Sequence, residues 1–168
     1  MQLKVASNGT KIWEHSIPGS QGMSEHRPSI TEIPAGGYLI VGEFSSNNMM
    51  TKLSTGGDVL FSKTLGVSLS AGKFYDVIPS GDGGFLLAGY GTNQYGEISG
   101  RLMKVDENGR FISSLQFGGQ RRDKFFSVCP TNDGHFIAAG ATLSGNEDGT
   151  FHHGQTYDDA WLMKVKVN

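Results

Sequence analysis

The stretch Asp82–Gly91, DGGFLLAGYG, joins a glycine turn to an apolar run, and nearly the same pattern recurs at 35–44 (AGGYLIVGEF) and 132–141 (NDGHFIAAGA). Glycine pairs tolerate the positive φ of a tight turn, so each copy predicts a hairpin leading into a β-strand. Each strand also carries a mid-strand glycine, where we expect a Cβ to strike a neighbouring sheet. These glycines are Gly42, Gly89 and Gly140.

A lysine-bearing strand also recurs, as QLKV, MMTKL, RLMKV and WLMKV, and the period is about fifty residues. Asn-Gly or Gly-Gly pairs stand just beyond the first three lysines, and another strand comes after them. The lysines are Lys4, Lys52, Lys104 and Lys164.

The unit opens with a further strand, seen as SITEIP, FYDVIP and FFSVCP, which we align on their closing prolines, Pro34, Pro79 and Pro130. Four short strands per unit and no sustained helical periodicity predict an all-β protein. Repeats of this length favour a β-propeller of four-stranded blades over a sandwich. We expect one domain, 1–168, with repeats at 28–66, 74–118 and 125–168 and a closing strand supplied by 1–19.

Composition limits the function classes. The 168 residues carry a formal charge of −2, which provides no basic surface for nucleic acid. The longest apolar runs are far too short to span a membrane. One cysteine, Cys129, excludes an internal disulfide framework. Twenty-five glycines, well above the usual share of about 7%, mark turns between apolar runs.

The unit DAWLMKVDENG…FGG…DG.FIAAG.T, assembled from Asp159–Val165 and Val105–Thr142, resembles the SBBP-type bacterial β-propeller repeat of the NHL-like superfamily. The family's Gly-Gly before the second strand is kept at Gly36-Gly37 and Gly83-Gly84 but becomes Gly134-His135. The resemblance implies a propeller fold and a bacterial, extracellular or cell-surface setting.

Counting strands suggests how the ring is completed. The chain opens on the third and fourth strands of a blade, continues through two complete blades, and ends on the first, second and third strands. About three blades are fewer than the usual four to eight. We therefore expect a homo-oligomer, most simply a dimer forming a six-bladed ring, with a piece of a larger propeller as the alternative. The strand at 2–5 is surplus in both arrangements.

Recognition is expected on the blade face that carries the more variable loops. Aromatic rings beside amides and carboxylates there suit a glycan or a polar protein segment. The candidate ligand-binding residues are Asn93, Gln94, Tyr95, Phe151, His152, Gln155, Tyr157 and Asp158.

Candidate chemistry is sparse. His152 and His153 stand near acidic residues, but adjacent histidines in an extended chain point to opposite sides, so no metal site is expected. Cys129 lies in a predicted strand and is expected to be a buried small hydrophobe. Asp76 and Glu32 would face opposite sides of their strands rather than pair for acid–base work.

We expect structural roles for two further groups of residues. The charged run Arg121–Lys124 is expected to be a solvated connection. Large aromatic side chains are expected to pack mostly between blades. They are Trp13, Phe61 and Phe111 on the outer strands and Trp161 on a third strand.

The sequence therefore predicts a non-enzymatic propeller scaffold, without cofactor, metal or catalytic residues, that recognises a protein or glycan. A hydrolase or lyase with a site at the central channel and a purely structural assembly element are the alternatives, because the fold alone does not separate them.

Overall fold

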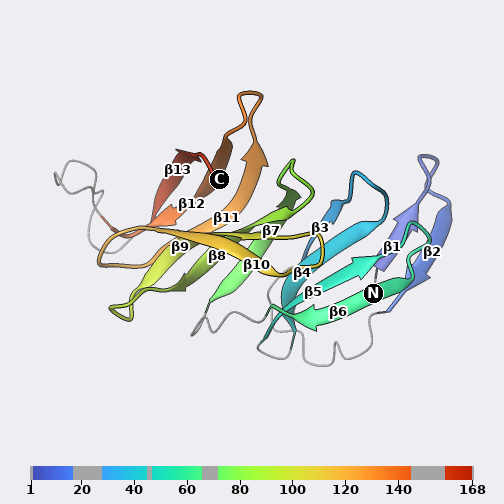
Figure 1. Ribbon diagram of the computed structural model, residues 1–168, viewed down its shortest axis with the longest axis horizontal. Helices are drawn as coiled ribbons and strands as arrows, with labels where there is room; N and C mark the ends of the chain where they lie inside the picture. The colour runs from blue at the N-terminus through green and yellow to red at the C-terminus, as the bar shows by residue number, and fades with distance from the viewer. Residues whose placement is uncertain (1, 17–27, 45–46, 66–71, 145–157, 168) are drawn as a thin grey trace.

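The computed structural model describes residues 2–16, 28–44, 47–65, 72–144 and 158–167 (Figure 1). Every regular element in these ranges is a β-strand, which confirms the all-β prediction. The strands form four antiparallel sheets in chain order, and none of the four closes on itself. The described residues contain no helix long and apolar enough to cross a membrane.

The sheets differ in strand number. The first sheet contains β1 (Gln2–Val5) and β2 (Lys11–His15). The second contains β3 (Ser29–Glu32), β4 (Tyr38–Phe44), β5 (Asn47–Leu53) and β6 (Val59–Thr64). The third contains β7 (Lys73–Pro79), β8 (Phe85–Thr92), β9 (Ile98–Val105) and β10 (Phe111–Phe117). The fourth contains β11 (Asp123–Pro130), β12 (Phe136–Thr142) and β13 (Asp159–Val165). We call β3, β7 and β11 the leading strands.

Tight five-residue turns connect the hairpins. In each, the N–H of the first residue donates to the carbonyl of the fifth, and the fourth residue is a glycine with φ between 69° and 101°. Only glycine adopts that backbone conformation without strain, so the glycine sets the register of its hairpin. These glycines are Gly9, Gly36, Gly57, Gly83, Gly96, Gly109 and Gly134.

The turn glycines, and not the prolines, mark equivalent positions in the repeat. Pro34 lies inside the turn at 33–37, whereas Pro79 and Pro130 are the last residues of β7 and β11. Glu32 ends β3 and occupies the place of those two prolines. The alignment predicted from the prolines is therefore wrong by two residues in the second sheet.

The sheets follow one another in chain order (Figure 1). They pack face to face, with an apolar layer between each pair. The third sheet is covered on both faces. Along β8, Phe85 and Leu87 enter the layer shared with the second sheet, while Leu86 and Ala88 enter the layer shared with the fourth. All four are buried, which explains why DGGFLLAGYG is apolar at consecutive positions.

The mid-strand glycines make room for a neighbour within their own sheet. A Cβ on Gly89 would lie 1.9 Å from the carbonyl oxygen of Lys73, and one on Gly140 would lie 1.9 Å from that of Lys124. Both oxygens belong to the paired leading strand, which shifts register at this point. The glycines thus accommodate a β-bulge, and the predicted clash with a neighbouring sheet is wrong for these two positions.

Aromatic packing between sheets follows the expectation with one exception. Trp13, Phe61 and Trp161 each pack into an inter-sheet layer. Trp161 stacks on Phe125 at 4.6 Å between ring centroids. Phe111 is 54% exposed on β10, so the expectation that it packs between sheets is wrong.

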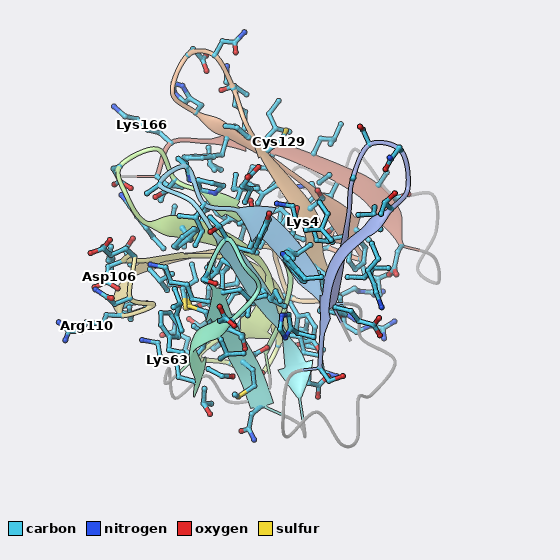
Figure 2. The ribbon with its side chains drawn as sticks, turned by 90° about the vertical axis from the view of Figure 1, so that its right-hand side faces the viewer. Lys4, Lys63, Asp106, Arg110, Cys129 and Lys166 are labelled. Carbon is cyan, nitrogen blue, oxygen red and sulfur yellow. The ribbon has the colours of Figure 1, made fainter. Side chains whose placement is uncertain are left out.

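Cys129 is exposed, contrary to the prediction of a buried thiol (Figure 2). Its equivalent on β7, Ile78, packs in the layer between the third and fourth sheets. Cys129 faces outward because no further sheet covers the fourth one among the described residues.

Asp123 corrects the expectation of a solvated charged run. It is fully buried, accepts hydrogen bonds from Gly119 N–H at 2.9 Å and Ser144 Oγ at 2.8 Å, and also binds the Thr142 hydroxyl. One carboxylate thus ties the connection before β11 to the end of β12.

Candidate functional site

The predicted recognition loop after β8 is a tight turn. Asn93 Oδ1 accepts the N–H groups of Tyr95 at 2.9 Å and Glu97 at 3.0 Å, and Gly96 holds the positive φ. Asn93 therefore shapes the turn. Gln94 is exposed, and Tyr95 presents 79% of its surface at the tip.

The other predicted residues follow β12. Asp158 is exposed just before β13. Phe151, His152, Gln155 and Tyr157 lie outside the described residues.

Two β-bulges build a cluster that the sequence did not predict. The register shifts on β7 between Phe74 and Asp76, and on β11 between Phe125 and Ser127, so Tyr75 and Phe126 are the extra residues. A bulge re-aims its side chain out of the regular pleat. The two rings lie 5.5 Å apart between centroids, and Phe126 is 48% exposed.

Tyr90 completes this group, and we call Tyr75, Tyr90 and Phe126 the inner aromatic cluster. The Tyr75 and Tyr90 ring centroids are 5.9 Å apart, and Lys124 Nζ lies 4.9 Å from the Tyr90 centroid. Because β8 runs from Phe85 to Thr92, Tyr90 is close to the strand end that leads into the Tyr95 turn. The cluster and the turn that carries Asn93, Gln94 and Tyr95 therefore share one end of the sheets.

Charged groups surround the cluster. Lys73 Nζ pairs with Glu43 at 2.6 Å, and Lys124 occupies on β11 the place that Lys73 occupies on β7. Burial, reinforced by Tyr90, raises the pKa of Tyr75 to about 12, so its hydroxyl stays protonated at neutral pH. A small hollow beside Lys124 is lined by Arg122, Ala141 and Asp158.

A buried guanidinium lies at the same end of the third sheet. Arg101 is 4% exposed, and burial lowers its pKa. Its Nη2 donates to the Thr92 carbonyl at 3.4 Å, while Nε and Nη1 have no hydrogen-bond partner within the described structure. A Cβ on Gly91 would lie 2.4 Å from Cζ of Arg101, so that glycine makes room for the side chain.

Asp76 holds the three leading strands together. Its Oδ1 accepts Ser29 Oγ of β3 at 2.8 Å and its own neighbour Val77 N–H at 2.9 Å. Its Oδ2 accepts Ser127 Oγ and Val128 N–H of β11, both at 2.9 Å. Ser29, Asp76 and Ser127 are equivalent in the repeat, so Asp76 is a structural acceptor. Glu32 holds the repeat position of Pro79, three residues after that of Asp76, so the two carboxylates belong to opposite faces of their strands, as predicted.

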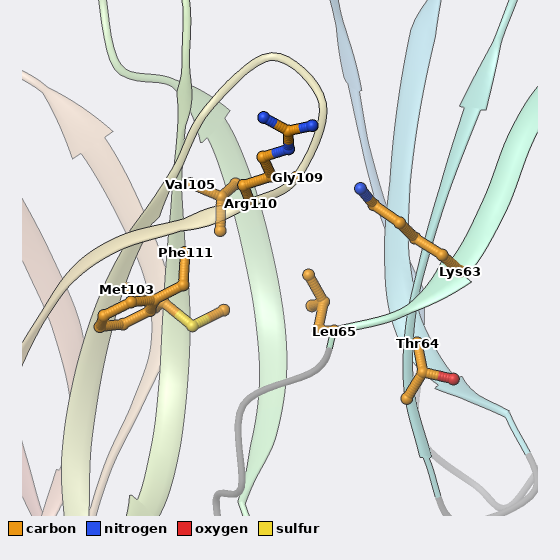
Figure 3. A pocket seen from close by; sticks show the side chains of 8 residues that line it. All are labelled: Lys63, Thr64, Leu65, Met103, Val105, Gly109, Arg110 and Phe111. Carbon is orange, nitrogen blue, oxygen red and sulfur yellow. The ribbon is translucent and has the colours of Figure 1, made fainter.

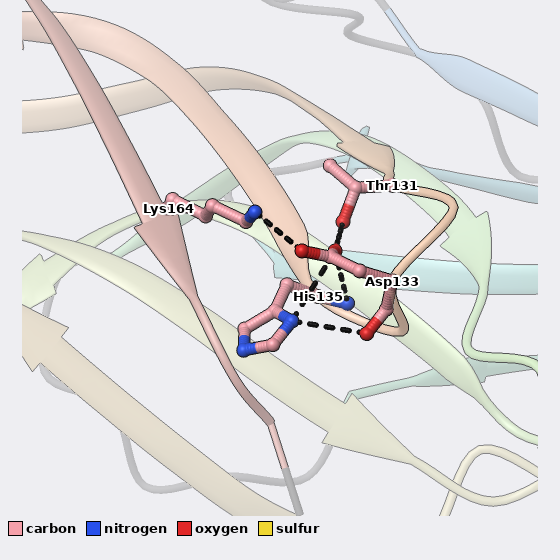
Figure 4. A network of polar contacts seen from close by, with 4 residues as sticks. All are labelled: Thr131, Asp133, His135 and Lys164. Carbon is pink, nitrogen blue, oxygen red and sulfur yellow. Dashed lines mark hydrogen bonds and ion pairs between the residues drawn. The ribbon is translucent and has the colours of Figure 1, made fainter.

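The opposite end of the sheets carries repeated aspartate–lysine pairs. Asp133 in the β11–β12 turn accepts from Lys164 Nζ at 2.6 Å and from the Thr131 hydroxyl, and His135 contacts it as well (Figure 4). The Lys164 contact holds the pKa of Asp133 well below its usual range.

The β7–β8 turn repeats this arrangement. Lys104 Nζ lies 2.7 Å from Asp82, and hydrogen bonds from Lys104 and then Ser80 lower the pKa of Asp82 to about 2. Two of the four repeated lysines, Lys104 and Lys164, thus brace the first hairpin turn of their sheets. A cavity of about 480 Å³ lies between the two turns and is lined by their residues.

A second hollow of about 340 Å³ lies on the outer rim, between β6 and the β9–β10 turn (Figure 3). Leu65, Met103 and Val105 line it and belong to the apolar layer between the second and third sheets. Lys63 reaches across its mouth to the Asn108 carbonyl. The hollow is therefore an extension of the inter-sheet packing.

Metal-binding groups do not gather in the described ranges: no cluster of three or more histidine, cysteine, aspartate or glutamate side chains occurs there. The predicted His152–His153 pair lies outside these ranges. Comparisons of the sequence with protein-family models and with curated proteins return no match.

Proposed function

We propose that this chain is a non-enzymatic recognition module, built on a β-propeller scaffold, that binds carbohydrate at the inner aromatic cluster. The observation that carries the proposal is the pair of bulges that sets Tyr75 and Phe126 side by side, with Phe126 48% exposed. Such rings offer flat apolar faces to sugar C–H groups, while neighbouring polar groups bind the hydroxyls.

The scaffold part of the proposal is supported by the sheet arrangement. Antiparallel sheets with strands in chain order stack face to face through continuous apolar layers. Asp76 joins the leading strands of three successive sheets, which is expected if those strands surround a common axis. Strands in this order around an axis are the arrangement of propeller blades.

The ligand class follows from the groups beside the rings. Lys124 and Arg122 supply hydrogen-bond donors, and Asp158 supplies acceptors, at the end where Tyr95 is exposed. Donors and acceptors beside an aromatic platform suit the hydroxyl groups of a sugar. Bulges that place aromatic side chains outside the ladder are typical of functional positions on sheets.

The test is binding to a panel of immobilised oligosaccharides, followed by calorimetry on the best binder. Phe126→Ala is expected to weaken binding at least about tenfold, because it removes the exposed ring of the platform. Phe111→Ala is the matched control, since Phe111 is similarly exposed but lies on β10, away from the cluster. An empty panel, or equal affinity for the Phe126 and Phe111 variants with folding intact by circular dichroism, would contradict the proposal.

A further inference from the structure

The outer face of the fourth sheet exposes a position that is buried in the two sheets before it. Leu162 pairs with Ala139, Leu102 with Ala88 and Met50 with Val41. The second residue of each pair directly precedes the mid-strand glycine of its strand. Met50 and Leu102 are 0% and 1% exposed because the next sheet covers them, whereas Leu162 is 75% exposed. The repeat therefore predicts another sheet against Leu162.

The outer face of the first sheet shows the complementary exposure. Val5 directly precedes its hairpin turn, as Leu53 and Val105 precede theirs, and it is 50% exposed while they are each 1% exposed. Leu3, on the same face, is 52% exposed. In the second and third sheets, the equivalent face packs against the preceding sheet.

Apolar side chains on the outermost strands are exposed in every sheet that has such a strand. Ile12, Leu60 and Ile112 are equivalent residues of β2, β6 and β10, and they are exposed by 55%, 59% and 49%. Since all three sheets show it, this exposure is a regular feature of the repeat. The exposure of Leu3, Val5 and Leu162 is confined to the two ends of the stack.

The two end sheets have complementary strand content. The fourth sheet stops at β13, the third position of the repeat, and the first sheet holds only the third and fourth positions, β1 and β2. Lys4 and Lys164 mark β1 and β13 as equivalents. Trp13 on β2 already packs on Ile40 and Leu53, as its equivalent Phe61 packs toward the third sheet.

We propose that β13 of a second copy of this chain replaces β1, so that β11, β12 and β13 of one copy and β2 of the other form a single four-stranded sheet. Two copies exchange strands reciprocally and close one ring, which is the closed symmetry most homodimers adopt. This inference rests on the propeller scaffold proposed above.

The exchange covers each end face. The hybrid sheet places Leu162 against the second sheet of the partner copy. On its other face, Met163 and Val165, which already pack against the third sheet, take the positions of Leu3 and Val5. β13 has seven residues and β1 has four, so the exchange also lengthens the ladder beside β2. The surplus strand β1 therefore occupies, in a single chain, the place beside β2 that β13 of the other copy takes in the dimer.

The first experiment measures mass by light scattering on a size-exclusion column across a dilution series. The expected mass is twice that of the 18.1 kDa chain. Leu162→Asp is expected to weaken the dimer roughly a hundredfold or more, because it places a charge in the new apolar layer. Leu60→Asp, on a rim position that stays exposed, is expected to leave the dimer unchanged. A monomeric parent protein, or equal effects of the two substitutions, overturns the proposal.

A cross-link separates strand exchange from any other contact between copies. Glu14 pairs with Leu3 on β1, so in the hybrid sheet it faces Met163, the equivalent of Leu3. With Cys129→Ser, the pair Glu14→Cys and Met163→Cys is expected to form a disulfide between chains, whereas Glu14→Cys with Leu3→Cys reports the unexchanged pairing. A dimer without the first bridge overturns the exchange. A monomer that still binds the oligosaccharide removes the second copy and leaves the recognition proposal standing.

Discussion

Replacing Asp76 with asparagine tests whether one carboxylate holds the leading strands together. The substitution keeps the size of the side chain but turns one acceptor oxygen into an N–H donor. If the amide nitrogen faces β11, it meets the Ser127 hydroxyl and the Val128 N–H, which now lie 2.9 Å from Oδ2. The backbone N–H of Val128 cannot rotate away. If the amide flips, the acceptor that disappears is the one that serves Ser29 and Val77.

The magnitude follows from the hydrogen bonds that the substitution removes. A hydrogen bond to a charged group contributes about 1.5–3 kcal/mol, and leaving a buried donor unpaired has a similar cost. Two bonds are affected, and partial exposure of Asp76 lets water replace part of the loss. We therefore expect a loss of about 2–4 kcal/mol in the free energy of unfolding, or a fall in Tm of roughly 4–16 °C.

The assay is urea unfolding followed by far-ultraviolet circular dichroism, with Asp58→Asn as the control. Asp58 is a turn residue that accepts one long bond, from Ser54 Oγ at 3.3 Å, so its substitution is expected to cost less than about 0.5 kcal/mol. If the Asp76 and Asp58 variants were equally stable, Asp76 would not join the three sheets in solution.

Two further predictions concern the bulges and the turns. Gly140→Ala places a Cβ 1.9 Å from the Lys124 carbonyl and is expected to destabilise by about 1–3 kcal/mol in urea unfolding. Gly56→Ala, whose nearest atom is 3.5 Å away, is the control, and equal losses would argue against the bulge explanation. The pKa of Asp82 falls from about 3.9 unfolded to about 2 folded, so its interactions stabilise the fold above pH 4 and that contribution disappears as pH falls toward 2. Lys104→Met removes the main partner of Asp82, so the acid limb of a plot of Tm against pH is expected to flatten; an unchanged limb would show that the pair does not contribute.

The strands and their grouping were readable from the sequence because the signals are local. A glycine at the fourth position of each turn, such as Gly83 or Gly109, is required by the backbone of a single hairpin. The apolar runs beside it indicate strands that are buried on both faces. The alignment of the leading strands failed because a proline suits both a turn, as at Pro34, and a strand end, as at Pro79.

The candidate site was harder to predict. Tyr75 and Phe126 leave the regular alternation only because each leading strand carries a bulge, and a bulge depends on the register of the paired strand. FYD and FFS were visible as equivalent stretches, and their alignment on Pro79 and Pro130 already placed the two aromatic residues at one position. Their contact with each other joins two different sheets, which a period in the sequence does not describe.

Local signals in the amino-acid sequence establish that this chain is all-β and repeats a four-stranded unit, because turn glycines and strand hydrophobicity act over a few neighbouring residues. The tertiary structure alone decided which equivalent residues are covered. Cys129 and Leu162 have the same apolar pattern as Ile78 and Leu102, yet they are exposed since burial depends on whether another sheet lies against theirs. It also decided that Asp76 serves as an acceptor for three sheets, because its donors come from strands about fifty residues away in the sequence.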